Sequence, residues 1–145
     1  MGYNWRMSSI TAALCLSQLN KIEKLINLRR QNAKYYQKKL AKIEEVKIHT
    51  EPNGYKHVYQ LFSIQLSSKK TRNDLSKFLA KKGIMSKVFF EPIHRTKHFS
   101  NYKIKQKKLQ VTETVSERIL SLPMYPELRK EEINEITDSI SEFLE

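Results

Sequence analysis

The sequence has little glycine and cysteine for its 145 residues. The three glycines, Gly2, Gly54 and Gly83, are too dispersed for a phosphate-binding loop of the Walker or dinucleotide type. The single cysteine, Cys15, excludes a disulfide framework and a cysteine-based structural zinc site. Because it lies within an apolar stripe, we expect Cys15 to be a small buried side chain rather than a nucleophile.

Long apolar runs are also missing. No stretch approaches the ~20 residues that a transmembrane helix needs, and the first residues do not resemble a signal peptide. We therefore expect a cytoplasmic protein without a membrane span. The length predicts a single domain over 1–145. A hydrophobic fraction of 39% argues against a disordered chain.

Charge is unevenly distributed along the chain. Residues 1–110 carry 24 basic and 6 acidic side chains, whereas residues 111–145 carry 3 basic and 9 acidic ones. The basic part could bind nucleic acid, because lysine and arginine release counterions when they contact phosphates. It could also be a lysine-rich solvated surface, since 20 of the 27 basic residues are lysines. We favour the second interpretation, because net charge says little about fold or site.

No pattern of residues forms a self-sufficient catalytic or metal site. His94 and His98 have the i, i+4 spacing that would place two metal ligands on one face of a helix. However, Pro92 and the polar surroundings predict a loop, and no third ligand is evident beyond Glu91. We therefore predict no metal site and no catalytic residue within this chain.

The spacing of apolar residues predicts an α+β fold, with a small antiparallel sheet covered by helices. Gly83 is the expected C′ residue after one of the helices. A polar loop is expected over 91–108. The expected strands span 46–49, 57–66 and 84–90, and the expected helices span 8–44, 70–82, 112–121 and 130–144.

The long helix over 8–44 contains no glycine or proline, and Arg29 interrupts its near-heptad apolar stripe. Ser8 or Ser9 can cap its start. A helix of this length can form a coiled coil or link two domains or subunits. Alternatively, the stripe is the core face of this domain, and we favour that interpretation for the second half of the helix.

Two segments carry side chains that a plain surface does not explain. In Gly2–Met7, Asn4 and Arg6 precede a helix start, whose unpaired N–H groups favour anions, and form a candidate clamp for phosphate or carboxylate. In 87–94, a predicted strand runs into a proline-fixed turn that presents His94. The alternatives are a hydrophobic staple with an exposed arginine, and an ordinary strand exit.

Five motifs, in order, resemble those of a known family. GYNWRMS followed by I-x-A-A-L resembles the G-Y-N-x-R-M motif of PLP-dependent nucleotide-sugar aminotransferases of the DegT/DnrJ/StrS type. The resemblance covers essentially all 145 residues, but only the C-terminal part of the family's full length. The other four motifs are HVYQLF at 57–62, KGI at 82–84, FEPIH at 90–94 and ILSLPMYPEL at 119–128.

The resemblance implies the small C-terminal domain of a fold-type-I aminotransferase, which the helix over 8–44 links to a large domain that binds pyridoxal phosphate (PLP). It implies that Asn4 reaches the cofactor phosphate of a neighbouring subunit in a dimer. It also implies that Arg6 lies near the anionic part of a nucleotide-sugar substrate and that His94 lines the active-site mouth. The implied partner is a second copy or a large-domain polypeptide in trans, and the implied pathway is polysaccharide or deoxysugar biosynthesis.

The segment that carries the family's Schiff-base lysine is absent from this sequence. Such a lysine needs a desolvated pocket that lowers its pKa, and the lysines after Ser68 offer no such pocket. We therefore expect that this chain alone neither binds PLP covalently nor transaminates, although it resembles part of a transaminase. The alternatives are a non-catalytic module that dimerises through the long helix and, less favoured, a nucleic-acid binder.

Overall fold

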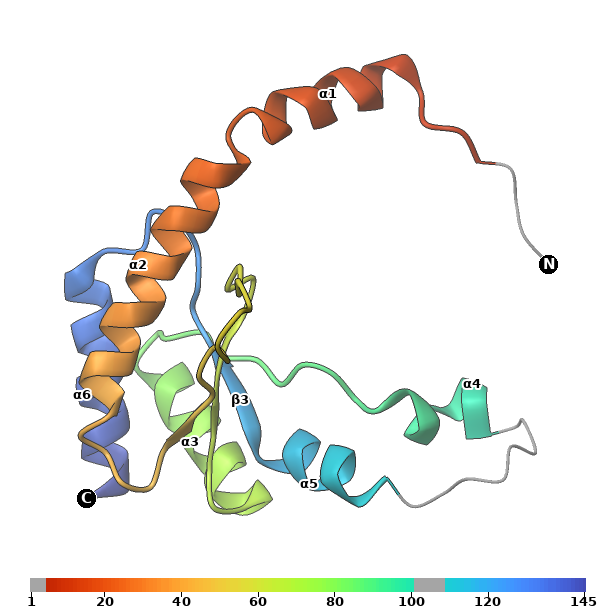
Figure 1. Ribbon diagram of the computed structural model, residues 1–145. Helices are drawn as coiled ribbons and strands as arrows, with labels where there is room; N and C mark the ends of the chain where they lie inside the picture. Colours follow the sequence, from red (N-terminus) through yellow and green to blue (C-terminus); the bar gives the residue numbers. More distant parts are fainter. Residues whose placement is uncertain (1–4, 101–108) are drawn as a thin grey trace.

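The computed structural model describes residues 5–100 and 109–145. It confirms the predicted α+β class, because helices pack on one small antiparallel sheet (Figure 1). In chain order the elements are α1 Ser9–Leu19, α2 Ile22–Leu40, β1 Lys47–Ile48, β2 Phe62–Gln65, α3 Lys69–Lys81, the 3-10 turn η1 Ile93–Arg95, α4 Lys97–Ser100, α5 Gln110–Arg118, β3 Ile119–Leu122 and α6 Lys130–Leu144.

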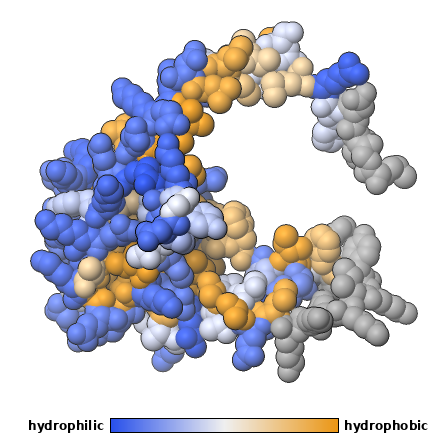
Figure 2. Space-filling model, in the orientation of Figure 1, coloured by the Kyte–Doolittle hydropathy of each residue, from blue (hydrophilic) through white to orange (hydrophobic). Residues whose placement is uncertain are grey.

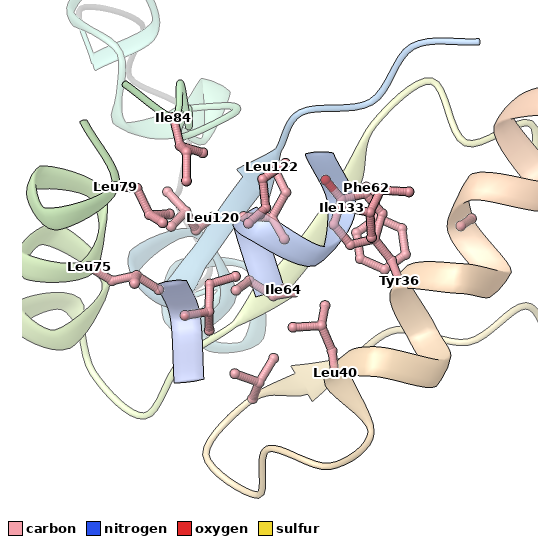
Figure 3. Close-up of a cluster of buried hydrophobic side chains, with 14 of the residues drawn as sticks. Tyr36, Leu40, Phe62, Ile64, Leu75, Leu79, Ile84, Leu120, Leu122 and Ile133 are labelled. Atoms are coloured by element: carbon pink, nitrogen blue, oxygen red, sulfur yellow. The ribbon is translucent and has the colours of Figure 1, made fainter. Parts of the chain in front are cut away.

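The three strands run in the order β1-β2-β3, and both neighbouring pairs are antiparallel. Side chains from β2, β3, α2, α3 and α6 meet in one hydrophobic core (Figure 3). Within it, Tyr36 of α2 stacks on Phe62 of β2 with the ring centroids 4.7 Å apart. Leu40, Ile64 and Leu120 are completely buried beside them. Removing this apolar surface from water is the main force that holds the helices to the sheet.

The single helix expected over 8–44 is wrong, because the chain forms two helices with a turn at Asn20 and Lys21 between them. Asparagine interrupts helices readily, since its side chain competes for backbone hydrogen bonds. At the other end, α2 stops at Leu40. The amide of Ile43 bonds to the Leu40 carbonyl at 3.0 Å, and this tighter turn directs the chain toward β1.

A strand stands where the end of a helix was expected. The predicted helix over 112–121 ends at Arg118, and β3 follows at once and pairs with β2. Leu120 and Leu122 are buried in the core, and the hydroxyls of Ser63 and Ser121 form a 2.7 Å hydrogen bond across the strand pair. Periodicity cannot separate so short an apolar strand from a helix end, because only its partner strand decides the difference.

All three strand predictions are too long, and the first, over 46–49, is shortened to β1. The segment over 84–90 contributes one bridge, between Lys87 and Ser121, and the strand over 57–66 is shortened to β2. Tyr59 adopts a φ of 48°, which interrupts the extended backbone before β2.

The remaining helices agree with the sequence pattern. Helix α6 has the predicted bounds, and α3 is shifted by one residue. Gly83 follows α3 with a φ of +77°, the left-handed conformation that suits glycine after a helix. In the described part of the expected loop over 91–108, the chain forms η1 and α4.

Candidate functional site

The N-terminal clamp is described in part. Asn4 lies outside the described residues, whereas Arg6 is exposed in the segment before α1. The hydroxyl of Ser8 accepts a hydrogen bond from the amide of Thr11 at 3.2 Å, which confirms that Ser8 caps this helix. The first turn of α1 contains no acidic residue. The helix N-terminus and the Arg6 guanidinium therefore form an electropositive end that suits an anion.

His94 lies in η1, directly after the proline-fixed turn that the sequence predicted. The amide of Arg95 bonds to the Pro92 carbonyl at 2.8 Å and closes this turn. The half-buried imidazole places its Nε2 atom 3.1 Å from Oε1 of Glu113 on α5. Hydrogen bonding to His94 and then to Arg95 lowers the pKa of the Glu113 carboxyl, against the opposing effect of burial. The sequence reasoning missed Glu113, because nineteen residues separate it from His94.

The two predicted substrate residues lie on different arms of the molecule. The segment before α1 ends one arm, and η1 with α4 lies on the other (Figure 1). Figure 2 shows an open hollow between the arms, bordered on one side by apolar side chains of α1. The segment before α1, which contains Arg6, and η1, which contains His94, therefore lie on different arms with the opening between them.

Helix α2 holds two of the motif segments in place through their backbone. The Arg29 guanidinium donates from Nη1 to the carbonyls of Tyr59, Gln60 and Met124 at 3.3, 3.2 and 3.1 Å. The Tyr36 hydroxyl donates to the Pro123 carbonyl at 3.1 Å. Arg29, which interrupts the apolar stripe of the helix, therefore joins 57–62 to 119–128.

A second ion pair orders the turn before β2. Arg30 binds both carboxylate oxygens of Glu51, at 2.6 and 3.0 Å, and also donates to the His57 carbonyl. The His57 amide donates to the same carboxylate. The hydrogen bond from Arg30, followed by that from the His57 amide, lowers the pKa of Glu51 to about 2. Glu51 is therefore ionised throughout the physiological pH range.

One pocket of the described chain is lined by neither of the predicted substrate residues, Arg6 and His94. It has a volume of about 440 Å³ and lies beside the connection between β1 and β2. The Nδ1 atom of His57 accepts from the Tyr59 amide at 2.8 Å, so this imidazole is used to shape the turn. We therefore place the candidate site at the hollow between the arms and not at this pocket. The pocket beside the β1–β2 connection is lined by His49, Thr50, Glu51 and residues 57–63.

The α1 arm, residues 5–22, is apolar and almost entirely exposed. Helix α1 has no charged residue and buries none of its side chains, and Ile10 is 85% exposed. Cys15 is exposed as well, so the expectation of a buried Cys15 is wrong for this chain by itself. Contiguous exposed apolar surface is typical of a protein contact. The large exposed apolar side chains of this arm are Trp5, Met7, Ile10, Leu14, Leu16, Leu19 and Ile22.

The lysines of the described residues differ from a lysine that forms a Schiff base with PLP. Every lysine in residues 5–100 and 109–145 is exposed except Lys39, which is half-buried and lies 3.5 Å from Asp138. A Schiff-base lysine needs a desolvated amine whose pKa is lowered. The described residues therefore do not fit covalent attachment of PLP, and no reaction step is assigned to this chain.

Two further features are missing from residues 5–100 and 109–145. No three histidine, cysteine, aspartate or glutamate side chains gather there as a metal would require. No described helix is long and apolar enough to cross a membrane.

Comparison with known proteins defines the class of the chain. It is 33% identical over 143 residues to GDP-perosamine synthase from Escherichia coli O157:H7, with 99% of this chain and 38% of that protein covered. It is also 33% identical over 141 residues to UDP-N-acetyl-3-dehydro-alpha-D-glucosamine 3-aminotransferase from Acidithiobacillus ferrooxidans, with 97% and 37% covered. The fold is that of the C-terminal part of a sugar aminotransferase.

A solved aminotransferase from Brucella abortus superposes with a TM-score of 0.87 and 30% identity, covering 99% of this chain and 38% of that one. The model of the DegT/DnrJ/EryC1/StrS aminotransferase family matches residues 1–141. The chain belongs to this family, whose members depend on PLP. It spans about 38% of the length of these relatives, in their C-terminal part.

Proposed function

We propose that this chain is the C-terminal part of a PLP-dependent nucleotide-sugar aminotransferase and acts together with a large domain that supplies the Schiff-base lysine. The observation that carries the proposal is the family match over residues 1–141, which covers only 38% of the length of GDP-perosamine synthase. The exposed α1 arm supports it, because large apolar side chains such as Ile10, Leu14 and Leu16 lie on its surface, as is typical of a protein contact.

Within this enzyme, Asn4 binds the cofactor phosphate, and Arg6 and His94 bind the nucleotide sugar. The electropositive start of α1 supports an anion beside Arg6. The hollow between the arms supports a shared site for Arg6 and His94, since each arm carries one of them (Figure 2). Two relatives of equal identity act on different sugars by their names, so the proposal extends to the nucleotide-sugar class and not to one sugar.

The test is complementation with a large domain. The part of GDP-perosamine synthase from Escherichia coli that precedes its match is joined to this chain, or mixed with it, in the presence of PLP. We expect an internal-aldimine absorbance and amino transfer to a nucleotide keto-sugar from the combination, and neither from this chain alone. Correct assembly without any amino transfer would contradict the proposal. Borohydride trapping of PLP on a lysine of the isolated chain would contradict the assignment of the lysine to the large domain.

The exposed α1 arm also supports the alternative of a non-catalytic module in which two copies of the chain pair through this helix. Sedimentation of the isolated chain separates the two possibilities. A stable dimer that dissociates in Leu19→Glu, combined with failed complementation, would favour the module. A chain that is monomeric alone and associates with the large domain would favour the enzyme.

A further inference from the structure

A cluster of charged side chains links η1 to α5. Glu113 and Glu117 are four residues apart on α5 and therefore lie on one face of the helix. Glu113 Oε1 lies 3.1 Å from His94 Nε2, and Glu113 Oε2 lies 2.8 Å from Nη2 of Arg95. Nη1 of Arg95 donates to Glu117 at 3.2 Å. Each oxygen of Glu113 therefore has its own partner in η1.

The chemistry of the carboxylate determines where the proton of His94 lies. His94 and Arg95 both lower the pKa of Glu113, so this side chain is ionised at neutral pH and can only accept hydrogen bonds. The Nε2 atom of His94 must then carry a proton. When the imidazole is neutral, its unprotonated nitrogen is Nδ1.

The position of Glu113 is in turn fixed by the body of the protein. Helix α5 leads directly into β3, which pairs with β2. Arg72, on α3, is only 5% exposed. Burial lowers the pKa of the Arg72 guanidinium, and the negative charge of Glu117 opposes this by favouring the protonated guanidinium. The acidic face of α5 therefore lies between Arg72 of the core and Arg95 of η1. The positions of Glu113 and Glu117 therefore do not depend on the 93–95 turn alone.

We propose that Glu113 is the positioning residue for His94, because its carboxylate holds the imidazole in the Nε2–H tautomer and anchors the 93–95 turn to α5. The proposal rests on the proposed function for the role of His94 toward substrate. Glu113 itself acts through His94 and Arg95. Glu117 accepts a hydrogen bond from Arg95 and strengthens the anchor without setting the tautomer.

The test uses ring ¹⁵N NMR of the full chain at a pH where His94 is neutral. In the wild type we expect His94 to be in the Nε2–H form. In Glu113→Ala we expect a mixture of tautomers, because the bond to His94 is lost. We also expect about tenfold faster amide exchange at Arg95 and Thr96, the factor that corresponds to the lost charged hydrogen bond from Arg95. The matched control, Glu117→Ala, keeps the wild-type tautomer.

Three results would overturn the proposal: an Nδ1–H tautomer in the wild type, an unchanged tautomer and exchange rate in folded Glu113→Ala, or an equal change of tautomer in Glu117→Ala. The wild-type measurement needs no variant, so it decides even where Glu113→Ala does not fold. Because the spectra come from this chain alone, a wild-type Nε2–H form with failed complementation would contradict the proposed function and not the role of Glu113.

Discussion

Helices α1 and α2 are neighbours along the chain but differ in how they use their apolar residues. Helix α1 is apolar without any charged side chain, and it buries none of its residues. Helix α2 is rich in lysine and arginine, yet its apolar stripe is completely buried at Ala33, Tyr36 and Leu40. Apolar content alone therefore does not place a helix in the core. In this chain a narrow stripe opposite a sheet is buried, whereas the apolar helix on an arm is exposed.

The largest effect is expected when one leucine of each helix is replaced by alanine. Leu40 is fully buried and Leu16 is 63% exposed. We expect Leu40→Ala to lower the free energy of unfolding by about 3 kcal/mol, because a buried cavity remains, and Leu16→Ala to change it by less than about 0.5 kcal/mol. Urea denaturation of the isolated chain measures both. Equal losses of unfolding free energy would show that α1 packs on this domain, and would contradict the difference between the two helices.

The second prediction concerns the affinity of the α1 arm for the proposed large domain. We expect Leu16→Glu to weaken association about 30-fold, roughly 2 kcal/mol, because a charge would be placed in an apolar contact. The control is Gln18→Glu, an exposed polar position on the same helix with the same added charge. Binding is measured by titration against the large-domain polypeptide. An equal loss in both variants would assign the effect to charge rather than to the apolar surface.

The third prediction concerns the polar bonds that α2 makes and α1 lacks. Arg29→Ala removes the donor to three carbonyls and is expected to lower the free energy of unfolding by about 1.5 kcal/mol. Arg29→Lys is expected to recover part of this loss, because an ammonium group can still donate hydrogen bonds but lacks the guanidinium fork. Urea denaturation again provides the values. Wild-type stability in Arg29→Ala would remove the proposed role of this residue in joining the two motif segments.

The smallest effect is expected for the ion pair of Arg30 with Glu51 on the surface of α2. The pKa of Glu51 in the folded chain is about 2, below the ordinary value of 4.5 for a glutamate, so folding favours the ionised form. Its contribution to stability is present above pH 4.5 and is lost as the pH falls toward 2. We expect the His57 amide resonance to shift over this range.

Glu51→Gln should lack this pH dependence at the His57 amide, and it serves as the control. A wild-type resonance that titrates near 4.5 instead would show that the carboxylate gains nothing from Arg30 in the folded chain. Since both side chains remain partly accessible to water, this ion pair contributes less than the core contacts of α2.

Much of the fold could be predicted because its signals are local. The capping serine Ser8, the left-handed Gly83 and the apolar stripe of α6 each act through neighbouring residues. The break at Asn20 and the strand β3 could not be predicted in this way. A helix end and a short strand have the same local pattern, and the pairing of 119–122 with β2 decides between them.

For the candidate site, the sequence indicated His94 and Arg6 but not what holds them. Glu113 was not expected, because its contact with His94 depends on how α5 lies beside η1. Arg29 was recognised only as an interruption of a stripe, since its three acceptors come from segments far along the chain. The prediction for Asn4 stays a prediction, because this residue lies outside the described part of the chain.

The family and the α+β class follow from the sequence alone, because ordered motifs and local periodicity carry this information. The tertiary structure decided that the α1 arm is exposed, that α2 binds the motif segments through their carbonyls, and that Glu113 faces His94. These facts depend on contacts between distant segments. Burial and hydrogen bonding are properties of the folded surface, and no local pattern contains them.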